Sequence, residues 1–442
     1  MKRRLITVAL ATSLLALGGC GQKSDTPKKD TKTGETAQKA ASDKAKAAGD
    51  KATEVAKTAG DAAKAGAEKA AGDVAKGAQG ALEAAADAKK TAAAMLKPGE
   101  APTPEQFEAL LLGLTACEVT ERDIDRKCDA WKAYDAARKA GRKAAMKNLG
   151  GLYASLGKKH ISHEHPAVRL QSASMMSSIF GASEDSQQAL VAAAKAEKDA
   201  RVLRAMIRAM GSSVGKNEGV RALLLETAQH ADEKVRIEVV SWLTSSWAQG
   251  TEGTLEKAMD IVKSDTSEDV RRFACKRLGE RGDERALPLL KKMTDAKQAE
   301  NLKDPRMFAS CFEGIIAMWS APVPHKAPSK AAYTHTLALL KDKAHRDEKN
   351  PPWTVFSRLR WAKKPKFQEA APWYKAADVH KVLNDIIVDR KTNWMARTGA
   401  VDTLKDLGGD KKVFEKLKKS YKGAEKQDAH VLKKIEKALS SL

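Results

Sequence analysis

Aromatic residues are scarce in this sequence, and one long segment has none. Phe, Trp and Tyr make up 5% of the 442 residues, and residues 21–100 contain no aromatic residue and only two leucines, Leu82 and Leu96. A segment of this composition cannot bury enough apolar surface to fold alone. Its alanines favour helix and its scattered glycines oppose it, so a fraying helix and a disordered stalk both remain open. We therefore expect residues 20–100 to form a low-complexity tether.

Long apolar runs and some catalytic motifs are missing too. The apolar run Leu5–Leu17 is too short to span a bilayer. There is no Gly-rich phosphate-binding loop and no Cys-x-x-Cys pair of the kind that holds zinc. We expect a non-enzymatic protein with no cofactor.

The N-terminus has the three zones of an export signal. Lys2, Arg3 and Arg4 precede the apolar run, and small residues follow it. The sequence Leu17-Gly18-Gly19-Cys20 resembles the lipobox of bacterial lipoproteins. That resemblance implies a signal peptide over residues 1–19 and an acylated Cys20 that binds membrane lipid. It places the protein in the cell envelope, with the outer membrane favoured over the inner because Gly21, not aspartate, follows the cysteine. An ordinary signal peptide with an incidental cysteine is the alternative.

The remaining residues, 101–442, carry most of the positive charge. The whole chain has a net charge of +22, of which the three N-terminal basic residues and residues 21–100 account for three each, leaving +16. A domain this basic favours an anionic partner. We expect that partner to be an anionic protein or an envelope polymer, and the export signal argues against nucleic acid.

A repeat of 33 to 35 residues is visible in this domain. Each copy has an apolar anchor followed four and eight residues later by further apolar or small residues, a spacing that predicts one buried helix stripe. Three residues before the anchor stands a side chain suited to cap a helix, except that we expect His165 to cap poorly. Glycines predict the helix ends. The anchors are Val168, Val202, Val235, Val270 and Ala396; the caps are Asp199, Asp232, Ser267 and Asn393; the glycines are Gly181, Gly211, Gly279 and Gly408.

The repeat resembles the HEAT family. The pattern Asp-x-x-Val-Arg-x-x-Ala-x-x-x-Leu-Gly is clearest over Ser267–Gly279, and Asp304-Pro-Arg-Met307 can begin another copy. The resemblance implies an all-α fold, an α-solenoid of stacked helix pairs over 101–442 that serves as a protein-interaction scaffold. It also implies that the arginines that follow four of the five anchors tie neighbouring repeats together. These arginines are Arg169, Arg236, Arg271 and Arg397.

Ahead of the repeats, a helix is expected from about Gln106 to Cys117, with Thr120 capping the next one. Four cysteines remain beside Cys20, an even number in an oxidising compartment. Cys117 with Cys128, across a turn, and Cys275 with Cys311, on successive repeats, are possible disulfides. Two buried free thiols are the alternative for the second pair.

Three histidines form a weak metal-site candidate. His160, His163 and His165 lie within six residues, with a carboxylate at Glu164. Deoxyhypusine hydroxylases hold iron with His-Glu pairs from several HEAT repeats, but His163-Glu164 is the single such pair here. The rival interpretation is nevertheless a metal-binding protein or enzyme centred on this loop.

The segment 353–375 is the strongest partner-binding candidate. It interleaves aromatic and basic residues, a composition typical of interaction hot spots. The alternative is that its rings fill the irregular packing of a degenerate repeat. The candidate residues are Trp353, Arg358, Arg360, Trp361 and Trp373.

A purely mechanical spacer is a third possible function for the chain.

Overall fold

The chain is predominantly helical in the part that the computed structural model describes. That part comprises residues 102–143, 149–177, 184–295, 297, 304–320, 327–343, 355–363 and 365–442. The chain divides into two compact units, Met1–Gln79 and Gly80–Leu442, and the first lies outside the described residues. The predicted signal peptide, Cys20, the predicted tether, Gly181 and Trp353 lie outside them as well.

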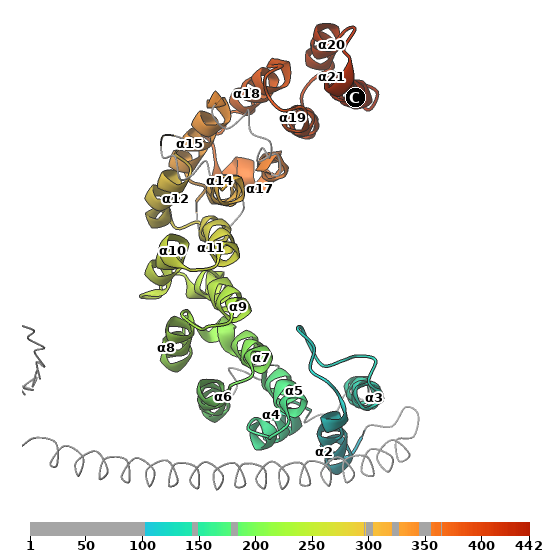
Figure 1. The fold of residues 1–442 in the computed structure, drawn as a ribbon, viewed down its shortest axis with the longest axis vertical. Coiled ribbons are helices and arrows are strands. Elements are labelled where there is room, and N and C mark those ends of the chain that lie inside the picture. The colour runs from blue at the N-terminus through green and yellow to red at the C-terminus, as the bar shows by residue number, and fades with distance from the viewer. Residues whose placement is uncertain are drawn as a thin grey trace, which may run out of the picture. The chain divides into compact units, whose positions relative to one another are not determined.

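Helices of about three turns follow one another along the second unit (Figure 1). Among the described residues, the one extended feature is an isolated antiparallel bridge between Val119 and Ile124. No described helix combines the length and the apolar character needed to cross a membrane. The helices are α2 (Pro104–Leu112), η1 (Gly113–Ala116), α3 (Asp129–Lys143), α4 (Leu149–His160), α5 (Pro166–Ser177), α6 (Glu184–Ala196), α7 (Ala200–Met210), η2 (Gly211–Ser213), α8 (Glu218–Thr227), α9 (Glu233–Leu243), η3 (Ser246–Ala248), α10 (Thr254–Ser264), α11 (Glu268–Arg281), η4 (Glu284–Ala286), α12 (Leu287–Met293), α14 (Pro305–Ser320), α15 (Lys330–Lys341), α16 (Phe356–Leu359), η7 (Arg360–Lys363), α17 (Pro365–Ala370), α18 (Ala376–Val388), α19 (Trp394–Asp406), α20 (Lys411–Ser420) and α21 (Lys426–Leu439).

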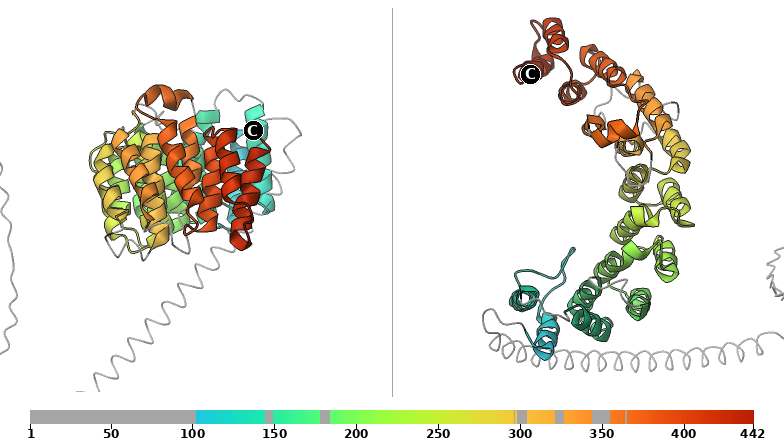
Figure 2. Two further views of the ribbon diagram at one scale, coloured as in Figure 1. Left: turned by 90° about the horizontal axis from the view of Figure 1, so that it is seen from above. Right: turned by 180° about the vertical axis from the view of Figure 1, so that it is seen from behind.

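The helices lie in two rows, which Figure 2 shows from above and from behind. One row, called row A here, runs α5, α7, α9, α11, α14, α16, α19 and α21, each packed on the next. The other, row B, contains α4, α6, α8, α10, α12, α15, α18 and α20. The predicted all-α solenoid is confirmed.

The predicted stripe forms the core of row A. Every anchor and every residue four or eight positions after it is buried, because these positions fall on one face of a helix. The predicted caps Asp199, Asp232, Ser267 and Asn393 each accept a first-turn amide. His165 was predicted to cap poorly, and this is wrong: its Nδ1 accepts the amide of Ala167 at 3.3 Å.

Three of the four arginines that follow an anchor tie one repeat to the next. Arg236 donates to the carbonyls of His230 and Ala231 before its own helix and pairs with Asp265 of the next repeat at 2.8 Å. Arg169 pairs in the same way with Glu197 at 2.7 Å. Arg397 pairs with Asp428 at 2.7 Å. Arg271 donates to the Asp265 carbonyl before its own helix, at 3.2 Å, and its tie to the next repeat stays a prediction.

The sequence predicted that Gly279 ends its helix, and this is wrong. Helix α11 continues to Arg281 and is capped by Gly282, whose φ is 70°. Gly279 instead lies where α11 crosses α14, and a Cβ there would stand 2.0 Å from the carbonyl oxygen of Gly314. The absence of a side chain lets the two backbones approach.

The predicted cap at Thr120 is also wrong. Helix α2 continues as η1 to Ala116, with Cys117 as the C-cap, so the expected end near Cys117 is confirmed. Thr120 instead closes a turn with Asp123, and its hydroxyl donates to the Asp123 carbonyl at 2.7 Å and accepts the Asp123 amide. Side chains of this kind compete with helix formation by bonding the nearby backbone. The next helix, α3, begins at Asp129.

Disulfides join both cysteine pairs. Cys117 and Cys128 bracket the turn around Thr120, with Cα atoms 5.7 Å apart. Cys275 and Cys311 join α11 to α14 near the Gly279 crossing, with Cα atoms 4.9 Å apart. Both bonds fix contacts between segments that would otherwise be held by packing alone.

Candidate functional site

A groove on row A gathers the most distinctive side chains of the solenoid. Its volume is about 690 Å³, and it lies between the ends of α7, α9 and α11, with η3 and η7 as walls. Pockets of this size suit a small molecule or a few residues of a peptide. The lining residues are Arg208, Glu238, Ser241, Trp242, Thr244, Ser245, Ser246, Trp247, Gln249, Arg277, Glu280, Arg281 and Trp361.

Three of the eight tryptophans of the chain line this groove. Trp242, on α9, packs over Gly211, where a Cβ would stand 2.0 Å from the indole ring. Its Nε1 donates to Glu238 at 3.2 Å. The absence of a side chain at Gly211 therefore lets the ring lie against the end of α7.

Trp247 is the most prominent apolar side chain of the groove, since 55% of it is exposed. It sits on η3, in a tight loop where Gly250 and Gly253 have φ values of 72° and 76°. A Cβ at Gly215 would stand 2.3 Å from the Trp247 carbonyl oxygen. Left-handed backbone and close approach both require glycine, so the loop has a defined shape. An exposed tryptophan on such a loop is typical of a binding surface.

Arg281 binds the backbone of this loop through its guanidinium. Its side chain is buried, and it donates to the carbonyls of Leu243 and Ala248 at 2.6 and 2.9 Å and to the Thr254 hydroxyl at 3.2 Å. Burial lowers the pKa of its guanidinium. The carbonyls at the end of α9 carry partial negative charge that compensates the cation. Arg281 is thus a positioning residue for the segment that presents Trp247.

The exposed charges of the groove are paired. Arg208 bonds Glu238 at 2.8 Å, and Arg277 bonds Glu280 at 2.7 Å. Arg358 approaches Glu280 as well, at 3.0 Å. The groove is therefore an aromatic surface with alternating charges at its edge and not a strongly cationic site.

The segment 353–375 contributes to the groove only in part. Trp361 lines it, and the guanidinium of Arg358 lies over the Trp361 ring, 4.7 Å from its centroid. Arg360 pairs with Asp406 on α19 at 2.9 Å. Of the five predicted partner-binding residues, Trp361 thus reaches the groove directly, while Arg358 supports it and Arg360 faces another helix.

Trp373 is partly buried and packs with its neighbours between α14, α15 and α17. The Trp373 ring lies 5.2 Å from that of Tyr333, and Tyr333 lies 5.0 Å from Trp319. Phe367 and Tyr374 complete the cluster. These rings pack against one another within the irregular repeat. This is the arrangement that the sequence analysis gave as the alternative to a partner-binding segment.

The three histidines are held in a local bond network. His160 Nε2 lies 2.6 Å from a carboxylate oxygen of Glu108, and Nδ1 of His163 accepts the amide of His165 at 3.0 Å. Burial would raise the pKa of Glu108, but its bonds to Lys159 and His160 outweigh that effect and lower it. His163 and His165 therefore each use Nδ1 to accept a backbone amide.

The same bond from a backbone amide to a histidine Nδ1 occurs in a second repeat, so it is a feature of the turn before the repeat helix. His230, two repeats after His163, accepts the amide of Asp232 through its Nδ1 at 3.0 Å. Burial lowers the pKa of His163 and of His165, which favours their neutral, accepting form. Across the described ranges, no group of three or more His, Cys, Asp or Glu side chains is placed to hold a metal ion.

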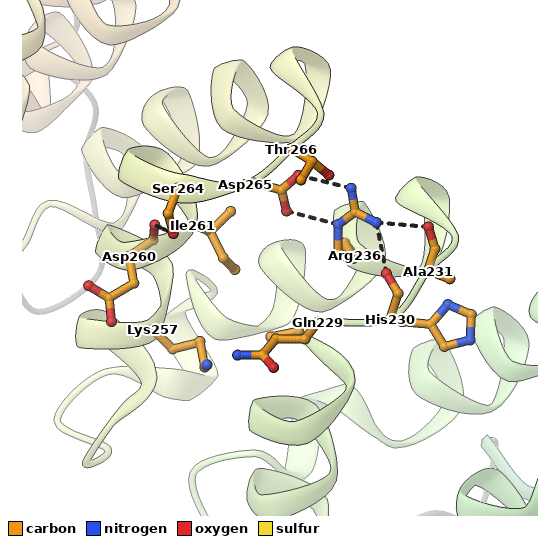
Figure 3. Close-up of a pocket in the computed structure, with 11 residues that line it drawn as sticks. Gln229, His230, Ala231, Arg236, Lys257, Asp260, Ile261, Ser264, Asp265 and Thr266 are labelled. Carbon is orange, nitrogen blue, oxygen red and sulfur yellow. Dashed lines mark hydrogen bonds and ion pairs between the residues drawn. The ribbon is translucent and has the colours of Figure 1, made fainter. Parts of the chain in front are cut away.

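A second cavity, of about 530 Å³, lies between α8, α9 and α10 (Figure 3). Figure 3 shows Arg236 at one wall with its bonds to Asp265, His230 and Ala231, while Lys257 and Gln229 lie at the other. At the Arg236 wall, the guanidinium and the Asp265 carboxylate are already paired with each other. The cavity is therefore a consequence of the contact between successive repeats.

Sequence reasoning missed Trp242 and Trp247. Their signal is a pair of tryptophans five residues apart at the end of one repeat helix. It also missed that Gly211–Gly215 reads Gly-Ser-Ser-Val-Gly, the spacing of a hydrolase nucleophile elbow. Ser213 lies at the end of η2 after a helix, and an elbow needs a preceding strand, so the pattern carries no catalytic meaning here.

Comparison with known proteins identifies the repeats. Residues 220–304 match the family described as HEAT repeats. No curated protein matches the chain. Human deoxyhypusine hydroxylase in complex with glycerol is similar at 13% identity and a TM-score of 0.26, over 58% of this chain and 99% of that one. An engineered protein is similar at 16% identity and a TM-score of 0.31, over 80% of this chain and 88% of that one. Neither likeness informs function, and the family match together with the fold shows that this chain contains a HEAT-like repeat domain.

Proposed function

We propose that this protein is a non-enzymatic scaffold that binds a segment of a partner protein in the tryptophan-lined groove. The observation that carries the proposal is the convergence of Trp242, Trp247 and Trp361 on one concavity, with Trp247 mostly exposed. Tryptophan and arginine dominate binding hot spots because they bury a large area and still make directed bonds.

The paired charges at the edge of the groove favour a protein segment as the occupant. Arg208–Glu238 and Arg277–Glu280 present both signs side by side, which suits a peptide that carries polar groups between apolar ones. The net charge of residues 101–442 favours an anionic partner overall. An anionic envelope polymer is the alternative occupant, with its sugar rings on the tryptophans.

We further propose that the scaffold is a lipoprotein of the cell envelope. Support comes from the signal-like N-terminus and from Leu17-Gly18-Gly19-Cys20. On this proposal, the acylated Cys20 anchors the chain in the outer membrane, and the tether over residues 20–100 connects this anchor to the repeat domain.

The metal or enzyme alternative at the histidine loop has weaker support. His163 and His165 would have to give up the amide bonds that shape their turn before their Nδ1 atoms could bind a metal. His160 would have to leave Glu108.

Chemical crosslinking of the full chain in its own cells tests the proposed function. We expect the wild-type protein to capture a discrete partner and Trp247→Ala/Trp361→Ala to lose it. Trp131→Ala is the matched control, since Trp131 lies on α3, outside the groove. Unchanged capture by the double variant, or an empty capture by the wild type, contradicts the proposal, and the second result fits a mechanical spacer.

A further inference from the structure

A second surface of different chemistry lies on the helix pair α20–α21. Residues 411–442 contain ten lysines, no arginine and four acidic residues, a net charge of +6. Eight of these lysines define what we call the lysine surface. They are Lys411, Lys412, Lys416, Lys419, Lys422, Lys426, Lys433 and Lys437, and all eight are exposed.

On α20 the lysines lie opposite the buried stripe. Phe414 and Leu417 are buried, 0% and 1% exposed. At about 100° per residue, Lys412, Lys416 and Lys419 fall on the far side of the helix from these two. The helix is thus divided into one face that packs on the domain and one cationic face.

On α21 the lysines form a single stripe. Lys426, Lys433 and Lys437 are spaced seven and four residues apart, which places them along one line, opposite buried Val431 and Ile435. An ion pair of 3.0 Å between Lys418 and Glu436 joins the two helices beside this stripe. The exposed faces of α20 and α21 are therefore neighbours.

Positive charge is in excess on this surface. Within the described part of the chain, none of the eight lysines makes an ion pair, whereas the adjacent Arg390 and Arg397 both pair with Asp428. Unpaired lysines at this density repel one another and attract anions.

The composition of the surface points to a flat anionic layer. Protein interfaces are enriched in aromatic residues and arginine, and residues 411–442 expose neither. Of the large apolar side chains there, Leu442 is the one that is mostly exposed, at 55%. Lysine is a mobile point charge that suits phosphates without fixed geometry, and lysine clusters on an amphipathic helix typically bind anionic lipid.

We propose that the lysine surface docks the repeat domain onto the phosphate headgroups of an anionic membrane. The contact is electrostatic, with no insertion of the helices, and it weakens as salt rises. It is independent of the tryptophan-lined groove and of any lipid on Cys20.

Vesicle co-sedimentation tests this with the full chain carrying Cys20→Ser, so that acylation makes no contribution. The probe is phosphatidylglycerol mixed with phosphatidylcholine in equal parts, beside vesicles of phosphatidylcholine alone. The test variant is Lys416→Glu/Lys419→Glu/Lys433→Glu. The control is Lys195→Glu/Lys198→Glu/Lys216→Glu, which makes the same charge change at exposed lysines elsewhere in the domain.

We expect the wild type to prefer the anionic vesicles and the test variant to bind them at least about a hundredfold more weakly, since each lysine lost removes roughly a fivefold factor near such a surface and each new glutamate adds repulsion. The control should lose much less, and circular dichroism should show both variants folded because all six lysines are exposed. Two results overturn the proposal: equal binding to both vesicle types, or equal loss of binding in the test and control variants.

Discussion

A side chain at Gly279 should destabilise the centre of the solenoid. In Gly279→Ala, the new Cβ would stand 2.0 Å from the Gly314 carbonyl oxygen and 2.2 Å from its carbonyl carbon and Cα. These are backbone atoms, so no rotamer change can relieve the overlap. Helices α11 and α14 would have to separate by about 1.4 Å to reach ordinary contact at 3.4 Å, and the disulfide between Cys275 and Cys311 resists that movement.

The magnitude follows from two opposing terms. Overpacking a core costs up to about 3 kcal/mol. Alanine gains about 1 kcal/mol over glycine in a helix. We therefore expect the free energy of unfolding to fall by about 2 kcal/mol.

Urea unfolding followed by circular dichroism measures this change. Gly219→Ala is the control, because its Cβ would meet Asn217 Oδ1 at 3.3 Å and Val191 at 3.8 Å, both side-chain atoms. We expect the control to be neutral or slightly stabilised. A Gly279→Ala variant as stable as the control would refute the close crossing of α11 and α14.

Three further predictions concern bonds that hold the repeats. Arg236→Met should lower the free energy of unfolding by about 3 kcal/mol or more, because it leaves Asp265, whose side chain is 4% exposed, without its partner; urea unfolding would show it. Replacing Cys117 and Cys128 by serine should cost about 3 kcal/mol through the loop that the disulfide closes, and a thermal midpoint equal to that of the wild type would argue against the bond. Because burial lowers the pKa of His163 below 6.5, the unfolded chain takes up a proton first as pH falls, so stability should be full above that pH and decline below it. Thermal melts from pH 7 to 5 should show this decline, and His163→Asn should lack that part of it.

Local patterns were readable from the sequence because they depend on nearby residues. Val235 and the residues four and eight positions after it share a helix face by geometry alone, and the Asp232 cap bonds amides two and three residues away. Such features need no knowledge of what packs against the helix. The repeat, its caps and the solenoid were therefore predictable.

The groove depends on contacts between distant residues. Trp361 comes from an insertion more than a hundred residues after Trp242, and nothing local to either predicts their meeting. Gly279 was misread for the same reason, since a glycine that ends a helix and one that meets Gly314 look alike in sequence. The aromatic segment was interpreted as one surface, yet packing divides it between the groove at Trp361 and the interior at Trp373.

The most direct test of the scaffold function is a photo-crosslinking amino acid placed at Ser246 of the full chain in living cells, since Ser246 is exposed, lines the groove and leaves Trp247 in place. The same amino acid at Gln188, exposed on α6 in row B, serves as the comparison. If the tryptophan-lined groove binds a partner, position 246 gives a discrete adduct that Trp361→Ala weakens and position 188 does not give. An identical adduct from both positions, or none from position 246, contradicts the account.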